Sequence, residues 1–370
     1  MTPKKHSILH MTPLAEIGGC EVNCLRIIEG CGEFDHRVVV FGARGPMSAR
    51  WENAGARVLH LDQWLLGRAR FEEALSKWSQ VEEMPEAVFL WSTSRLPTVL
   101  EVLRPWDVRW SVYLGNPVQP GLAHWIRLQF QEWFHPAPTS VTLVACSEHV
   151  AMSHRSAPYF RRFATRVIYN AVDPALDVPR HYRELAPGMG PRLGMVARLD
   201  RIKDHKTIIR ATALVAKIRP DIVVEFAGDG PLMRELQHEA RCCGVADQVR
   251  FLGSMPVGYL LASWDIYTHS TTDSEGMGTA VAEAMMSGLP CLVSDLAVMR
   301  EVCGLDGAAY APAGNAEGFA AAIVALINDR TRREMMGRNA RVIAREIFGL
   351  PKIAAAYERV VFPREGRAGP

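Results

Sequence analysis

The chain has 370 residues, of which 48% are hydrophobic and 22% charged, a composition typical of ordinary globular proteins. Its length favours two domains, each large enough to have its own hydrophobic core. Because 42 Lys and Arg residues nearly balance 40 Asp and Glu residues, the net charge is only +2. This balance gives no support for a basic nucleic-acid-binding surface, and we expect no nucleic-acid partner.

The spacing of the cysteines and the lengths of the apolar runs indicate the cellular compartment of the protein. The eight cysteines are scattered and form no Cys-x-x-Cys pair, which favours free thiols in the cytosol. The apolar run 7–11 is too short for the core of a signal peptide, and the longest run elsewhere, 319–327, is too short to span a bilayer. We therefore expect a cytoplasmic protein with at most a peripheral contact to a membrane.

In the first part of the chain, short apolar runs alternate with segments of helical periodicity, a pattern typical of parallel sheets built from βαβ units. A strand is expected at 7–11, followed by Gly18, Gly19 and a helix at 20–30. This glycine pair lacks the G-x-G-x-x-G spacing of a dinucleotide site, and a plain strand-to-helix turn is an equal alternative. Further strands, with helices between them, are expected at 37–41, 57–61, 87–91, 109–114, 141–146 and 165–169.

The segment 121–135 is rich in aromatic side chains. It is compatible with a helix that lies on a membrane surface and equally with an ordinary helix that faces the core. Because Arg127 is its single Lys or Arg residue, we favour a helix that faces the core or a binding cleft.

The second part begins after a stretch rich in proline and glycine, 174–190, which is typical of a linker. Arg198 and Lys203 follow an expected strand at 192–196 and precede a helix at 204–218. This order places two cations at the carboxyl edge of a parallel sheet, where ligands bind; a solvated basic loop is the alternative. The other elements expected here are strands at 222–228, 249–252 and 266–269 and helices at 316–328, 330–345 and 351–361.

The stretch 274–295 combines a glycine-bracketed loop, a short alanine-rich helix, a Gly-Leu-Pro break and an apolar strand. Gly276 and Gly278 allow a ligand to approach the backbone, and the N–H groups at the start of the helix favour an anion. Glu283 lies among apolar residues of the helix, where its charge needs a donor partner, and Glu275 lies in the loop. A ligand that carries an anionic group and a polyol would satisfy both the N–H groups and the carboxylates. In the alternative, Glu283 pairs with an arginine of the same domain and Glu275 is solvated.

The two glutamates, with seven residues between them inside an EG-x-G … EAM-x-x-G-x-P frame, resemble the signature of the retaining nucleotide-sugar glycosyltransferases of family four. Gly18-Gly19 and the segment 170–173 also resemble that family. The resemblance implies the GT-B fold, an α/β architecture of two Rossmann-like doubly wound domains that face each other across a cleft. The implied domains are an N-terminal acceptor-side domain at 1–173, a linker at 174–190, a nucleotide-sugar-binding domain at 191–345, and a C-terminal helix and tail at 346–370 that cross back to the first domain.

The resemblance also implies roles for particular residues. Arg198 and Lys203 hold the donor diphosphate and act with Glu275 in catalysis, while Glu283 binds the ribose hydroxyls. The other implied donor contacts are Gly18, Gly19, Gly228, Gly276, Met277, Gly278 and Thr279. Family members often carry a histidine after the strand at 109–114, where this chain has none. Asn116 and Tyr113 are the acceptor contacts expected there, and a turn set by Asn-Pro is the favoured alternative for Asn116.

The implied activity is transfer of a hexose-type sugar, with retention of configuration, from a nucleoside diphosphate sugar, expected to be a UDP-sugar. The implied acceptor is a hydroxyl of a cell-envelope glycan, a lipid-linked sugar or a small-molecule glycoside. No Asp-x-Asp pair lies beside an expected strand end, so we expect no metal and no cofactor apart from the donor. A nucleotide-sugar epimerase and a non-catalytic nucleotide-sugar-binding protein of the same fold are the alternatives.

Overall fold

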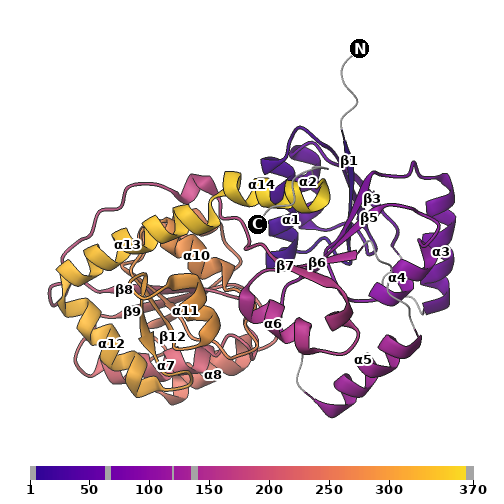
Figure 1. The fold of residues 1–370 in the computed structure, drawn as a ribbon. Coiled ribbons are helices and arrows are strands. Elements are labelled where there is room, and N and C mark those ends of the chain that lie inside the picture. Colours follow the sequence, from indigo (N-terminus) through magenta and orange to yellow (C-terminus); the bar gives the residue numbers. More distant parts are fainter. Residues whose placement is uncertain (1–5, 63–67, 119–120, 135–140, 364–370) are drawn as a thin grey trace. The chain divides into compact units, whose positions relative to one another are not determined.

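The computed structural model describes residues 6–62, 68–118, 121–134 and 141–363 (Figure 1). The chain divides into two compact units: the first comprises Met1–Ala171 with Leu350–Pro370, and the second comprises Val172–Gly349. The stretch 174–190, which we expected to be a linker, belongs to the second unit, and Leu185 within it is buried in that unit's core.

The described part of the first unit is built on a seven-stranded parallel sheet in the order β3-β2-β1-β4-β5-β6-β7. The order reverses between β1 and β4, and in doubly wound sheets such a reversal opens a crevice at the carboxyl edge where ligands bind. The strands are β1 (Ser7–Thr12), β2 (Asp35–Val40), β3 (Arg57–His60), β4 (Ala87–Leu90), β5 (Arg109–Leu114), β6 (Val141–Ala145) and β7 (Ala164–Val167).

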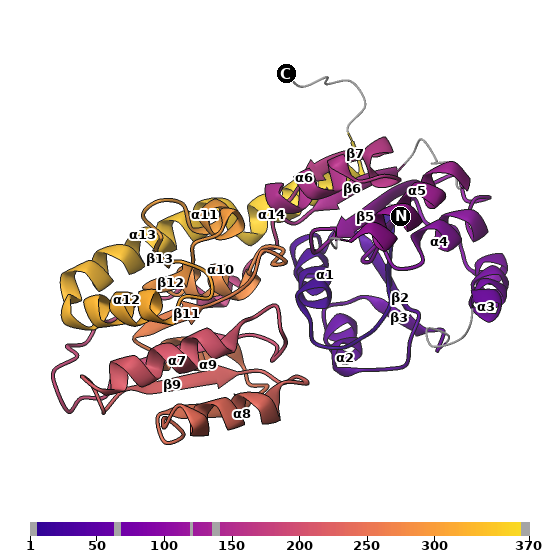
Figure 2. The ribbon, with the colours of Figure 1, turned by 90° about the horizontal axis from the view of Figure 1, so that it is seen from below.

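The helices of the first unit connect these strands. In the described residues α1 contacts both α2 and α14, and α3 contacts α4 (Figure 2). Helix α6 begins after Ser147, whose side chain accepts a hydrogen bond from the N–H of Val150 and so caps the helix. The helices are α1 (Gly19–Gly30), α2 (Pro46–Asn53), α3 (Arg68–Val81), α4 (Leu96–Val102), α5 (Leu122–Phe134), α6 (Glu148–Ser156), the short η1 (Phe160–Arg162) and α14 (Leu350–Val361).

The final helix, α14, packs against α1 and β5 of the first unit, which confirms the predicted return of the C-terminal helix to that domain. The hydroxyl of Tyr357 accepts a hydrogen bond from Asn23 at 3.0 Å, and its ring centroid lies 5.3 Å from that of Phe89. A Cβ atom on Gly30 would lie 2.8 Å from that of Ala354, so glycine permits the close approach of α1 to α14.

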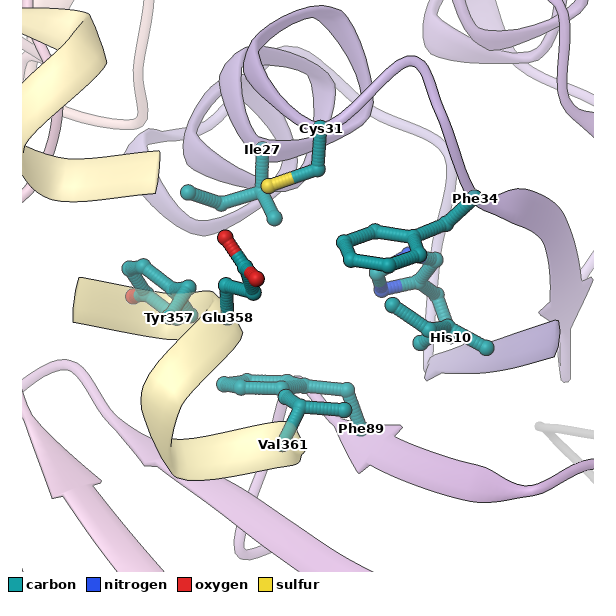
Figure 3. Close-up of a pocket in the computed structure, with 9 residues that line it drawn as sticks. His10, Ile27, Cys31, Phe34, Phe89, Tyr357, Glu358 and Val361 are labelled. Carbon is teal, nitrogen blue, oxygen red and sulfur yellow. The ribbon is translucent and has the colours of Figure 1, made fainter. Parts of the chain in front are cut away.

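A small cavity of about 10 Å³ lies under α14 and has room for about one water molecule (Figure 3). Its walls are mainly apolar, and Glu358 of α14 supplies a carboxylate. The lining residues are Ile8, His10, Ile27, Cys31, Phe34, Phe89, Tyr357, Glu358 and Val361.

A buried hydrogen-bonded chain next to this cavity fixes the tautomers of His10 and His36. Trp91 Nε1 donates to His10 Nδ1 at 3.1 Å, so the proton of His10 resides on Nε2. That Nε2 lies 2.9 Å from Nδ1 of His36, whose own Nε2 lies 2.8 Å from the carbonyl oxygen of Cys31. Both rings are therefore neutral. Burial, with a further contribution from His36, lowers the pKa of His10 well below its ordinary value.

The described part of the second unit contains a six-stranded parallel sheet in the order β10-β9-β8-β11-β12-β13, the doubly wound order of Rossmann folds. The reversal lies between β8 and β11. Strand β13 was not expected, because its sequence Ala-Ala-Tyr-Ala has little β propensity; pairing with β12 defines it. The strands are β8 (Arg192–Val196), β9 (Val223–Ala227), β10 (Val249–Gly253), β11 (Ile266–His269), β12 (Cys291–Ser294) and β13 (Ala308–Ala311). Two doubly wound domains confirm the predicted fold class.

Helices α7 and α12 of the second unit pack against each other and share its core with the sheet. Arg333 is 2% exposed and donates to the carbonyl oxygens of Leu326 and Ile327, which end α12. The helices are η2 (Pro174–Leu176), α7 (His205–Ala216), α8 (Met233–Cys242), α9 (Val257–Ser263), α10 (Thr279–Met286), α11 (Ala297–Cys303), α12 (Ala316–Asn328) and α13 (Arg330–Phe348).

Helix α5 corrects one expectation. Of the two placements favoured for the segment 121–135, facing the core or facing a binding cleft, the structure contradicts the first. Leu128 is buried, whereas Trp125, Phe130 and Trp133 are 51%, 52% and 67% exposed. The helix is held through Leu128 and through Glu132, which accepts hydrogen bonds from Arg161, so Trp125, Phe130 and Trp133 face solvent. Across the described residues, helices long and apolar enough to cross a bilayer are absent.

Candidate functional site

The candidate site residues of the second unit follow β8 and β11, the neighbouring strands at the reversal in strand order. Arg198 and Lys203 lie in the loop between β8 and α7, and Glu275 lies in the loop between β11 and α10. The two loops touch, because the N–H of Thr272 donates to the carbonyl oxygen of Ile202 at 3.0 Å. The carboxyl edge of the sheet therefore brings together residues that are far apart in the sequence.

Glu275 is the centre of a hydrogen-bonded cluster that joins the two loops. It is 6% exposed, and its Oε2 forms an ion pair with Nζ of Lys203. The same oxygen lies 3.2 Å from Nε2 of His269 and 3.1 Å from Oγ1 of Thr271, while Oε1 accepts from the N–H of Gly276 at 3.2 Å. Both carboxylate oxygens are therefore bonded within the protein.

The surroundings of Glu275 keep it ionised. Burial by itself would raise its pKa, but the charge of Lys203 and the hydrogen bonds from His269 and Lys203 outweigh burial and hold the pKa well below its ordinary value. Burial lowers the pKa of His269, so a neutral ring with its proton on Nε2 donates to the carboxylate. The cluster is a compensated buried ion pair, and removal of either partner leaves an uncompensated charge.

Arg198 lies at the surface of the same region, with a side chain 73% exposed. Its Nε donates to Oδ2 of Asp200 at 2.8 Å. The other oxygen of Asp200 accepts from the backbone N–H groups of Ile202 at 3.0 Å and Lys203 at 3.3 Å. Asp200 therefore folds the loop and orients the guanidinium, while Arg198 is accessible to a ligand from solvent.

Gly228 follows β9 and has a φ of +141°. A Cβ atom on it would lie 2.1 Å from the carbonyl oxygen of Ala197, the residue before Arg198. Its N–H donates to the carbonyl oxygen of Gly253 at 2.8 Å. Glycine is required here because three chain segments meet at the strand ends, and Gly228 thereby shapes the loop that carries Arg198.

The loop after Glu275 leads into α10 through backbone of unusual conformation. Gly278 caps this helix with a φ of +73°, and a Cβ atom there would lie 2.8 Å from Cε of Met299. No side chain caps the helix from this position, and Met277 before it is 2% exposed. The first helical residue is Thr279, and Glu283 one turn later is half-buried. This arrangement presents the positive end of the α10 dipole beside Glu275.

The predicted residues of the first unit follow β1 and β5. Gly18 is the N-cap of α1 and Gly19 is its first residue, next to the reversal in strand order, and a Cβ atom on Gly18 would lie 2.5 Å from Oε2 of Glu21. Asn116 is exposed in the bend that follows β5. Tyr113 is 4% exposed, and its hydroxyl donates to Asn170 at 2.8 Å, so we leave Tyr113 out of the proposed site.

Sequence reasoning missed three residues of the site. Asp200 and Thr271 order the two loops, and His205 is the first residue of α7, with its ring centroid 5.0 Å from that of Phe226. His205 is 1% exposed, and neither ring nitrogen has a hydrogen-bond partner among the described residues. Burial, together with the nearby His269, lowers the pKa of His205 to about 3. The position of Asp200, Thr271 and His205 close to the motif residues in the sequence is the signal that could have identified them.

The cysteines have the state expected from their spacing. Within the described residues all eight are free thiols. In the same residues no group of three or more His, Cys, Asp or Glu side chains is arranged to hold a metal ion.

The chain is similar to known glycosyltransferases over its second unit. Residues 181–343 match the family described as glycosyl transferases group 1. The putative glycosyltransferase EpsF of Bacillus subtilis is 27% identical over 174 residues, 45% of each chain. The N-acetyl-alpha-D-glucosaminyl L-malate synthase of Bacillus anthracis is 25% identical over 53% of each chain. The matched region spans about half the length of these relatives.

Solved structures extend the similarity to both units. Anabaena HepE, in complex with UDP and glucose, superimposes with a TM-score of 0.80 and 18% identity over 96% of this chain and 99% of its own. Staphylococcus aureus TarM superimposes with a TM-score of 0.78 and 9% identity over 96% of this chain and 100% of its own. At such identities the likeness establishes the fold. Residues 181–343 of the second unit therefore match the glycosyl transferases group 1 family, and the solved structures show that the chain has the GT-B fold.

Proposed function

We propose that this chain is a retaining glycosyltransferase that moves a hexose-type sugar from a nucleoside diphosphate sugar to a hydroxyl acceptor. The observation that carries the proposal is the cluster of Lys203, Glu275 and the start of α10 at the reversal of the second sheet, with Arg198 exposed beside it. Two cations and a helix N-terminus at one sheet edge suit a diphosphate.

The names of similar proteins support a sugar nucleotide as donor. HepE is described with UDP and glucose and with UDP-glucose, and TarM with UDP. We therefore propose a UDP-sugar as the first donor to test. Acceptors named among the relatives differ: the Mycobacterium leprae protein is a phosphatidyl-myo-inositol mannosyltransferase, and a Streptomyces kanamyceticus protein is a 2-deoxystreptamine glucosyltransferase. For this chain we propose a cell-envelope glycan, a glycolipid or a small-molecule glycoside, reached from the cytoplasm.

In the proposed reaction, the bond between the anomeric carbon and the diphosphate oxygen breaks and the leaving diphosphate gains negative charge. Arg198 and Lys203 stabilise that charge, which is a role that divalent metals fill elsewhere. The acceptor hydroxyl attacks from the same face, and its proton passes to the departing phosphate oxygen. Glu275 holds Lys203 in place and lies beside the donor sugar with the backbone of Gly276, Met277 and Gly278.

The remaining contacts are part of the same proposal. Glu283, half-buried on α10, binds the ribose hydroxyls, and Thr279 at the start of the helix contributes its N–H to the phosphates. Gly228 supports the Arg198 loop. Gly18 and Gly19 contact the donor from the first unit, and Asn116 contacts the acceptor.

The test is to incubate the purified chain with UDP-glucose, UDP-N-acetylglucosamine and GDP-mannose and measure release of nucleoside diphosphate, with and without a panel of hydroxyl acceptors. We expect release that depends on one donor and rises with an acceptor. Interconversion of the donor sugar without release would indicate an epimerase instead. Tight donor binding without turnover on any acceptor would indicate a binding protein.

A further inference from the structure

Helix α5 of the first unit presents an apolar face to solvent. At about 100° per residue, Trp125, Leu122, Trp133, Ile126 and Phe130 follow one another across an arc of about 140°. These five side chains are between 42% and 74% exposed. Gln129 also falls within the arc, and its amide is directed to Glu132, to which it donates at 2.9 Å. Five large apolar side chains on one exposed face are more than scattered surface residues require. We call these five residues the α5 face.

Cations flank both edges of the α5 face. Arg127 is exposed on the edge beyond Phe130. Glu132 lies beyond Trp125 on the other edge, and it binds Arg161 through two hydrogen bonds of 2.9 and 3.0 Å. Arg162 donates to the backbone carbonyl of Glu132 at 2.9 Å. Within α5 and η1, three arginines therefore face one carboxylate, which leaves an excess of positive charge around the apolar face.

The apolar face and its basic edges together indicate which of two partners covers the α5 face: a second copy of the chain or a lipid bilayer. A second copy of the chain that packed face to face through α5 would bring arginine-lined edges opposite each other, because both edges are basic in either orientation of the pair. A bilayer with anionic headgroups has the opposite charge. It also accepts tryptophan rings at the boundary between headgroups and acyl chains, while arginines reach the headgroups.

We propose that the α5 face docks the first unit onto the surface of an anionic lipid bilayer. The helix lies in the plane of the interface, with Leu122, Ile126 and Phe130 toward the acyl chains. Arg127 and Arg161 contact lipid phosphates. The proposal concerns a lipid surface and depends on neither the donor nor the acceptor of the proposed reaction.

The test uses the full chain and vesicle flotation without donor or acceptor. Vesicles of phosphatidylcholine alone are compared with equal mixtures of phosphatidylcholine and phosphatidylglycerol. The patch variant combines Ile126→Gln, Phe130→Gln and Trp133→Gln. The matched control combines Ile218→Gln, Leu305→Gln and Met335→Gln, which lie in the second unit at 65%, 82% and 59% exposure. Because all six positions are exposed, circular dichroism is expected to show the same fold for both variants.

We expect the unmodified chain and the control to float with the mixed vesicles, and the patch variant to lose binding by about tenfold or more. Binding should weaken in high salt and on vesicles of phosphatidylcholine alone. Equal flotation of the patch variant and the unmodified chain overturns the proposal, as does equal binding to both kinds of vesicle. Absence of flotation, with a dimer in light scattering that the patch variant abolishes, overturns it in favour of a second copy. Because activity is assayed separately, failure here leaves the proposed reaction untouched.

Discussion

Lys203 and Glu275 form a buried ion pair across 72 residues of sequence, and this pair joins the loop after β8 to the loop after β11. His269 and Thr271 contact the same carboxylate oxygen. The pair therefore has a structural role in addition to any role in catalysis. It fixes the position of an ammonium group at the sheet edge where a diphosphate is proposed to bind.

Lys203→Ala and Arg198→Ala are expected to differ in stability and to agree in activity. Each should lower kcat by about two to three powers of ten, because each removes a charge that stabilises the leaving diphosphate. Lys203→Ala should also lower the free energy of unfolding by about 3–5 kcal/mol, because Glu275 loses its buried counter-ion. Arg198 is exposed, so Arg198→Ala should unfold at the same urea concentration as the unmodified chain. Unchanged kcat in both variants would refute the diphosphate assignment.

Substitution of the two glutamates should separate binding from chemistry. Glu283→Gln is expected to weaken donor affinity with little change in kcat, because ribose contacts are alike in the ground and transition states. Glu275→Gln is expected to reduce the rate at saturating donor, because Lys203 loses its partner and positive charge develops nearby at the anomeric carbon. Initial rates against donor concentration, with calorimetry of donor binding, measure both. The division of roles is wrong if Glu283→Gln binds donor normally or Glu275→Gln changes affinity alone.

Chelation should leave the reaction intact. We expect full activity in excess EDTA, since the cations of Arg198 and Lys203 are proposed to take the part of a metal at the diphosphate. The measurement is nucleoside diphosphate release with EDTA, with added Mg²⁺ and with added Mn²⁺. Loss of activity in EDTA that either ion restores would contradict this expectation.

The buried His10 should make stability depend on pH. Its folded pKa lies below the value of about 6.5 in the unfolded chain, so the unfolded chain binds more protons. Above about pH 6.5 the contribution of His10 to the free energy of unfolding therefore has its full value. Below that pH the contribution declines by at most about 1.4 kcal/mol per pH unit. Thermal unfolding between about pH 7.5 and pH 5 should show a shallower decline for His10→Gln, whose amide can replace both hydrogen bonds. Parallel pH profiles for the two proteins would exclude His10 as the cause.

Two glycine substitutions should distinguish close packing from backbone strain. Gly228 and Gly244 both have positive φ. A Cβ atom on Gly228 would collide with the backbone of Ala197, whereas a Cβ atom on Gly244 would have no neighbour within 4 Å. Gly244→Ala should cost about 1–2 kcal/mol from the backbone conformation alone. Gly228→Ala should cost clearly more and should also raise the KM for the donor, because the segment before Arg198 must shift. Urea unfolding and donor kinetics give both numbers, and equal costs would disprove the packing argument.

The sequence by itself predicted the parallel sheets, the placement of Arg198 and Lys203 after a strand, and the placement of Glu275 in a loop before a helix. These features depend on local pattern: apolar runs form buried strands, glycines mark the turns, and parallel strands present their carboxyl ends at one edge. The return of the C-terminal helix to the first domain came from the family resemblance, and the structure confirms it.

Tertiary structure alone decided which partners these residues meet. The pairing of Lys203 with Glu275, and the support from His269, depend on how neighbouring strands align, which residue spacing does not encode. The same holds for α5: its periodicity marks an apolar face, but a periodic pattern does not specify what covers that face. In the described structure Leu128 faces the protein and Trp133 faces solvent, because the helix is attached to the domain along one edge only.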